Sequence, residues 1–119
     1  MSGNSFTVQS PLGYTVVCSS EFWNHIDDRH PIMKENEKAL VNAISDPVAI
    51  YSSEKWPEKR DVYFGKTSQA TYGEKMFTKV VIDKPDEYNK EGQVISAWPQ
   101  KSISGNINER GLRYVKSKL

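Results

Sequence analysis

Two histidines and an arginine lie close together in the stretch "FWNHIDDRHPIM", and these are the only two histidines of the chain. An imidazole titrates at about pH 6.5 and exchanges protons near neutrality, and a guanidinium offers a fork of N–H donors that suits phosphate. A helix over residues 20–29 would place His25 and Arg29 on one face, while Pro31 would direct His30 separately. A base, an acid and a cation are the groups that metal-free cleavage of a phosphodiester requires.

The same segment also has a structural interpretation. Asp27 and Asp28 lie between the candidate residues, and a histidine in the last turn of a helix interacts favourably with the helix dipole. Residue types and spacing alone therefore leave catalysis and packing both open for this segment.

The elements that would position these side chains follow from periodicity. Alternating residues on both sides of Pro11-Leu12-Gly13 predict a β-hairpin over residues 1–19. Ser19 or Ser20 would cap the first helix, which ends near Arg29 or His30, and the stretch 32–45 has the period of a second helix. Period-two patterns predict the strands that follow, at 48–53, 61–65, 77–83 and 93–99.

We therefore expect an α+β fold, with the hairpin and two helices packed on a mainly antiparallel sheet of about four strands. The stretch "FTKVVID" (77–83) is apolar on both faces near its middle, which favours a central position in that sheet. A single domain should span residues 1–119, with its core at about 20–102 and a basic tail at 103–119 that could end in a short strand or helix.

Composition excludes several classes of protein. The 119 residues are 37% hydrophobic and 26% charged, which is typical of one globular domain, and 16 Lys+Arg against 15 Asp+Glu give no overall basic excess. One cysteine, Cys18, and two histidines argue against a structural zinc site, and no run approaches the roughly 20 apolar residues of a membrane span. The expectation is a cytoplasmic protein that uses neither a metal nor another cofactor and does not associate with a membrane.

Polar residues that interrupt apolar strands are the remaining candidates. Lys79 shares a strand face with Phe77 and Val81, and Ser96 lies on the next strand, so both could line a cleft or belong to an ordinary exposed sheet face. Arg60 is either a solvated loop charge or a phosphate contact. The candidate substrate-binding residues, aromatic or basic in type, are Tyr63, Trp98 and Lys101.

The order of these segments resembles the barnase–EndoU–colicin–RelE superfamily of metal-independent ribonucleases, in its phage and polymorphic-toxin branch. Five stretches carry the resemblance over about residues 20–102: "HIDDRHPIM", "ENEKALVNAISDPVAIY", "RDVYFG", "KVVID" and "GQVISAWP". Three positions depart from the family pattern. Ile32 stands where an acidic residue is usual, Ser96 replaces threonine and keeps its hydroxyl, and Trp98 replaces tyrosine.

The resemblance implies an endoribonuclease, in which the ribose 2′-hydroxyl attacks the adjacent phosphate and leaves a 2′,3′-cyclic phosphate. It implies six catalytic residues: His25, Arg29, His30, Arg60, Lys79 and Ser96. Which histidine is the base stays open. RNA such as tRNA would be the substrate, and an immunity protein or antitoxin would be the partner. The alternative is a non-catalytic module on the same scaffold that binds RNA or protein.

Overall fold

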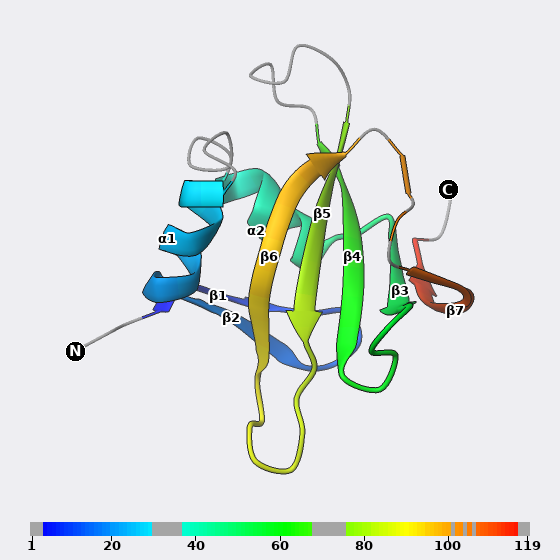
Figure 1. Ribbon diagram of the computed structural model, residues 1–119, viewed down its shortest axis with the longest axis horizontal. Coiled ribbons are helices and arrows are strands. Elements are labelled where there is room, and N and C mark those ends of the chain that lie inside the picture. The colour runs from blue at the N-terminus through cyan, green and yellow to red at the C-terminus, as the bar shows by residue number, and fades with distance from the viewer. Residues whose placement is uncertain are drawn as a thin grey trace.

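Two helices and seven strands make up the described part of the chain in this computed structural model, which covers residues 4–29, 37–67, 76–100, 102–103, 105 and 107–116 (Figure 1). In chain order they are β1 (Asn4–Gln9), β2 (Thr15–Ser19), α1 (Ser20–Arg29), α2 (Glu37–Ser45), β3 (Ala49–Ser53), β4 (Arg60–Thr67), β5 (Met76–Asp83), β6 (Gly92–Gln100) and β7 (Ile107–Val115). Neither helix is long and apolar enough to cross a membrane.

All seven strands form one sheet with the order β1-β2-β6-β5-β4-β3-β7. Neighbouring strands are antiparallel except for β2 and β6, which are parallel. The strand β5 lies at the centre of the sheet, as its apolar residues predicted. The fold combines helices with a sheet, as expected, but the expectation of about four mainly antiparallel strands is wrong, because the sheet is larger and mixed.

The hairpin and the C-terminal tail account for the additional strands. In β2, Val16 and Val17 pair with Gly92 and Gln93 of β6, so the hairpin extends the sheet. At the opposite edge β7 pairs with β3, with two shifts in register. A pairing between segments so far apart in the chain has no local sequence signal, and shifts in register disturb the alternation by which a strand is recognised.

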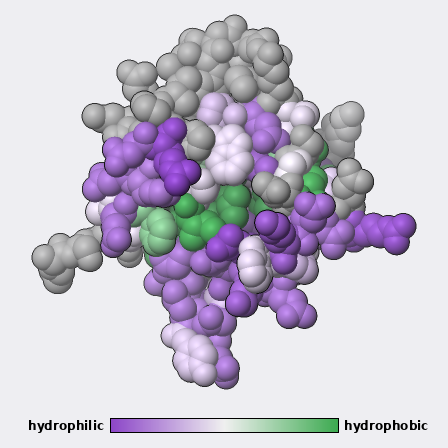
Figure 2. Space-filling view, in the orientation of Figure 1, coloured by the Kyte–Doolittle hydropathy of each residue, from purple (hydrophilic) through white to green (hydrophobic). Residues whose placement is uncertain are grey.

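The two faces of the sheet differ in what covers them. Both helices pack on one face, α2 against β4 and β5 and α1 against β6, and the hairpin crosses the same side (Figure 1). We call this the inner face and the opposite one the outer face. Figure 2 looks onto the outer face and shows a hydrophobic patch over the middle of the strands, with hydrophilic residues around it.

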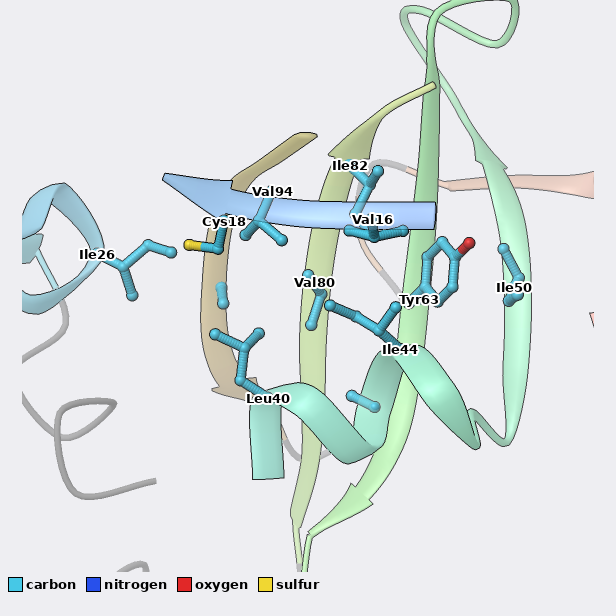
Figure 3. Close-up of a cluster of buried hydrophobic side chains, with 12 residues drawn as sticks. Val16, Cys18, Ile26, Leu40, Ile44, Ile50, Tyr63, Val80, Ile82 and Val94 are labelled. Carbon is cyan, nitrogen blue, oxygen red and sulfur yellow. The ribbon is translucent and has the colours of Figure 1, made fainter. Parts of the chain in front are cut away.

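The core lies between the inner face, the hairpin and the helices (Figure 3). The Ser19 hydroxyl accepts a hydrogen bond of 3.1 Å from the backbone N–H of Phe22 and so caps α1, whose Ile26 enters the core. Helix α2 approaches β4 closely at Gly65, which has no side chain. A Cβ added there would lie only 2.4 Å from Cα of Ala43. The buried cluster comprises Val16, Cys18, Ile26, Leu40, Ala43, Ile44, Ile50, Tyr63, Val80, Ile82, Val94 and Ala97.

A chain of polar groups, buried at Ser10, Tyr63 and Asp61, connects the hairpin with strands β4 and β7. The Tyr63 hydroxyl lies 2.5 Å from Oγ of Ser10 and 2.8 Å from the hydroxyl of Tyr14, which donates to Oδ2 of Asp61 at 2.8 Å. Nε of Arg113 lies 2.9 Å from Oδ1 of Asp61, as an ion pair without hydrogen-bond geometry. Burial raises the pKa of the Asp61 carboxyl, although the Tyr14 hydroxyl and the Arg113 charge oppose the shift.

Candidate functional site

Side chains on the outer face of β4, β5 and β6 stand in rows, because residues that pair across neighbouring strands point to the same side. Successive rows are two residues apart along β4 and β5, or about 6.6 Å, whereas on β6 a shift in register separates Ser96 and Gln93 of the last two rows by three residues. From one end of the sheet to the other, the rows are Lys66–Phe77–Gln100, Phe64–Lys79–Trp98, Val62–Val81–Ser96 and Arg60–Asp83–Gln93.

Lys79 occupies the middle of the second row and is 1% exposed. Its ammonium nitrogen lies 5.0 Å from the ring centroid of Trp98 and 5.8 Å from that of Phe64, and it donates a hydrogen bond of 2.5 Å to the carbonyl of Gly105. Burial lowers the pKa of the Lys79 amine, because the charged form loses its hydration. A lysine of this kind gives up its proton more readily than an exposed one. In its charged form the ammonium interacts favourably with the faces of the two aromatic rings.

Ser96 and Trp98 lie beside this lysine on the next strand. Trp98 pairs with Lys79, and Ser96 lies one row further along β6, opposite Val81. Both side chains are half-buried, and the indole N–H of Trp98 donates to Oε1 of Gln100 at 3.2 Å. The structure therefore brings together three of the predicted residues: a cation, a hydroxyl and an aromatic ring on one face.

The helix with the first candidate residues, α1, packs against β6 from the inner face (Figure 1), whereas Lys79, Ser96 and Trp98 stand on the outer face. His25 and Arg29 are exposed and share one flank of α1 with Phe22, at the spacing of adjacent turns. His30 and Lys101 lie outside the described residues, and so does Ile32.

Arg60 is on the same face but at a distance from Lys79. It stands two rows away, about 13 Å along the strand direction. Its Nε forms an ion pair of 2.9 Å with Oδ1 of Asp83. In this arrangement Arg60 and Lys79 have separate partners, Asp83 and the carbonyl of Gly105.

Tyr63 points to the inner face and is fully buried. Burial raises the pKa of its hydroxyl to about 12, while its hydrogen bonds to Ser10 and Tyr14 act in the opposite direction. A base cannot stack on a ring enclosed in the core, so Tyr63 is not part of the surface formed by Lys79, Ser96 and Trp98.

Two groups at this site were not found from the sequence, namely the ring of Phe64 and the carbonyl of Gly105. Period-two alternation places Phe64 and Tyr63 on opposite faces of a strand, but does not tell which strand lies beside it. The contact with Gly105 joins β5 to a residue that follows β6 in the chain, and no local pattern predicts such a contact. A lysine in the middle of an apolar strand was the one signal that this position is unusual.

Comparison with models of protein families, with curated proteins and with solved structures gave no match for this chain. Among the described residues, no three side chains of His, Cys, Asp or Glu come together as a group that could hold a metal ion.

Proposed function

We propose that the protein is a metal-independent endoribonuclease whose substrate RNA lies on the outer face of the sheet, over β5 and β6. The observation that carries the proposal is the group formed by Lys79, Ser96 and Trp98 on the outer face. The helix with His25 and Arg29 packs against β6, the strand that carries Ser96 and Trp98. A buried lysine in the centre of a sheet costs stability, because its charge must be desolvated, whereas an apolar residue would pack there without that cost. Its presence at this position therefore favours a functional role for the side chain.

The proposed roles follow from the chemistry of each group. One histidine, His25 or His30, takes the proton of the attacking 2′-hydroxyl, and the other protonates the leaving 5′-oxygen. Arg29 and Lys79 stabilise the charge that develops on the phosphate, and Ser96 positions the scissile group by a hydrogen bond. Trp98 offers a ring on which a base can stack. Lys79 would exchange the carbonyl of Gly105 for a phosphate oxygen as its acceptor.

The second candidate is a module that binds RNA on the same face without cleaving it. The position of Arg60 favours this alternative, because one of the cations expected at the phosphate is instead paired with Asp83, two rows from Lys79. Aromatic and cationic side chains on a sheet are sufficient for binding single-stranded RNA.

Incubation of the purified protein with total RNA in EDTA distinguishes the two. We expect cleavage that leaves 2′,3′-cyclic phosphate ends, and a loss of about 10²- to 10⁴-fold in rate in His25→Ala, as for removal of a general acid or base. Lys79→Met should also lose activity, whereas Lys38→Met, at an exposed position on α2, is the matched control. RNA that stays intact between about pH 5 and pH 9, the range that brackets imidazole titration, would contradict the enzyme.

An active ribonuclease of this kind needs an inhibitor in the cell that makes it. We therefore propose an immunity protein or antitoxin as its partner, and cellular RNA such as tRNA as its substrate. Its site of action would be the cytoplasm, either of its own cell or of a target cell into which it is delivered. Co-purification of a tight complex that blocks cleavage would identify the partner.

A further inference from the structure

A cleft of about 440 Å³ lies where the connection between β3 and β4 meets the connection between β5 and β6. It adjoins the fourth row of the outer face, since Arg60, Asp83 and Gln93 all line it. Its volume is within the range of sites that take small molecules, roughly 300–1,000 Å³. Trp56 also lines the cleft and is 48% exposed, so part of its side chain is open to solvent.

The walls of the cleft are held together by contacts between the two connections. The backbone N–H of Lys84 donates to the carbonyl of Lys59 at 2.8 Å, and the Lys84 ammonium lies 3.3 Å from the carbonyl of Pro57. The ion pair of Arg60 with Asp83 joins the end of β5 to the start of β4. These contacts hold the two walls of the cleft together.

The charges in the cleft are mixed. Ammonium and guanidinium groups stand beside an equal number of carboxylates: Lys59, Arg60 and Lys84, with Glu58, Asp83 and Asp86. A bare phosphate would be repelled by the carboxylates, and a simple cation by the basic groups. A nucleotide suits both, because its phosphate pairs with cations while the amino and imino groups of its base donate to carboxylates.

Trp56 supplies the remaining feature of a nucleotide site. The Lys59 ammonium lies 5.5 Å from the centroid of its ring, and the ring is partly open to solvent. Stacking on an aromatic ring is the common means by which proteins hold an unpaired base, and it does not depend on the identity of the base. The Nη groups of Arg60, beyond the Nε that meets Asp83, can donate to a phosphate.

We propose that this cleft is a nucleotide subsite, which stacks one unpaired base of an RNA strand on Trp56 while Lys59, Arg60 and Lys84 hold the adjoining phosphate. The inference rests on the proposed function, because it takes the strand to run along the outer face from Lys79 to the cleft. It assigns Arg60 to a phosphate next to the cleft, about 13 Å from Lys79 along β5. The substrate would then need an unpaired stretch beyond the cleavage point.

The test uses a short single-stranded oligonucleotide with 2′-O-methyl riboses, which cannot be cleaved by attack of a 2′-hydroxyl. Affinity is measured by fluorescence anisotropy for the intact protein and for variants. We expect Trp56→Ala to bind roughly tenfold more weakly, as for the loss of one stacked base. Tyr88→Ala is the matched control, because Tyr88 is an aromatic residue of the β5–β6 connection that is 89% exposed and does not line the cleft.

A second variant, Lys59→Gln, tests the phosphate contact. The slope of log affinity against log salt should fall in magnitude by about one relative to the unmodified protein. Equal affinity of Trp56→Ala and the unmodified protein, or no binding of the oligonucleotide at all, would overturn the subsite.

The outcome separates the subsite from the enzyme. Binding that depends on Trp56 in a protein that leaves total RNA intact supports the subsite and contradicts the ribonuclease. If Trp56→Ala cleaves RNA as efficiently as the unmodified protein and binds the oligonucleotide with unchanged affinity, the result supports the ribonuclease and contradicts the subsite.

Discussion

Lys79→Met is expected to raise the free energy of unfolding at neutral pH, because it removes a charge from a side chain that is 1% exposed. Desolvating an ammonium costs several kcal/mol. The hydrogen bond to Gly105 offsets about 1.5–3 kcal/mol of this, and the rings of Phe64 and Trp98 offset about 0.5–2 kcal/mol each. Methionine has an unbranched chain that packs well against aromatic rings. The two sides nearly balance, so the expected gain is only about 1 kcal/mol.

The pH dependence of that gain is the sharper part of the prediction. Burial lowers the pKa of Lys79 in the folded protein below its ordinary value of 10.5. Between the folded pKa and 10.5 the unfolded chain binds more protons, so the stability of the unmodified protein rises with pH in that window. Each unit by which the pKa is lowered contributes about 1.4 kcal/mol to that rise. The methionine variant lacks the titrating group, and its advantage should therefore shrink as the pH approaches 10.5.

Urea unfolding followed by circular dichroism at a series of pH values from 7 upward to about 10.5 measures both proteins under the same conditions. Lys38→Met on α2, an exposed position, controls for the replacement of a lysine by methionine. A difference between Lys79→Met and the unmodified protein that is constant with pH, or that grows toward 10.5, would refute the claim that the Lys79 charge is buried at a cost.

Three further predictions concern the fold. The pKa of Asp61 is raised in the folded protein, so the folded state binds more protons than the unfolded chain between pH 3.8 and the raised pKa, and stability should fall as pH rises through that window. Asp61→Asn should abolish this fall, and urea titrations across acidic pH test it. Gly65→Ala should lower the free energy of unfolding by about 1–3 kcal/mol, because the added Cβ would lie 2.4 Å from Cα of Ala43. Ala43→Gly in the same chain should not restore the stability fully, since it leaves that Cα in place. A thermal melt of Gly65→Ala with no shift would contradict the close packing of α2 on β4. Ser19→Ala should cost about 1 kcal/mol by removing the cap of α1, whereas Ser19→Gly should cost only a few tenths, and equal melting temperatures for Ser19→Ala and the unmodified protein would argue against the cap.

Local patterns predicted the elements of this protein well. The hairpin, the cap at Ser19, the end of α1 at Arg29 and the strands β3 to β6 lie within about two residues of their expected positions, a margin usual for element ends. Capping residues and alternation act within a few positions of the chain, and a single sequence contains them directly.

Pairings between distant segments were not predictable in the same way. The parallel pairing of Val16 with Gly92 joins the hairpin to β6, and the C-terminal strand shifts register around Leu112 and Tyr114. The face shared by Lys79 and Ser96 followed from alternation on adjacent strands. The burial of Lys79 did not, because it depends on Gly105, which lies in the chain beyond β6.

The two roles open to Lys79 predict opposite effects of one substitution. If the hydrogen bond to Gly105 and the ring contacts outweigh the cost of desolvating the ammonium, the lysine is structural, and Lys79→Met lowers stability and leaves any RNA chemistry intact. If the charge is retained for function, the same variant gains stability and loses cleavage, the trade-off usual for polar groups buried at active sites. Stability and cleavage measured on the same preparation of Lys79→Met therefore separate a structural lysine from a catalytic one, without any assumption about which RNA is the natural substrate.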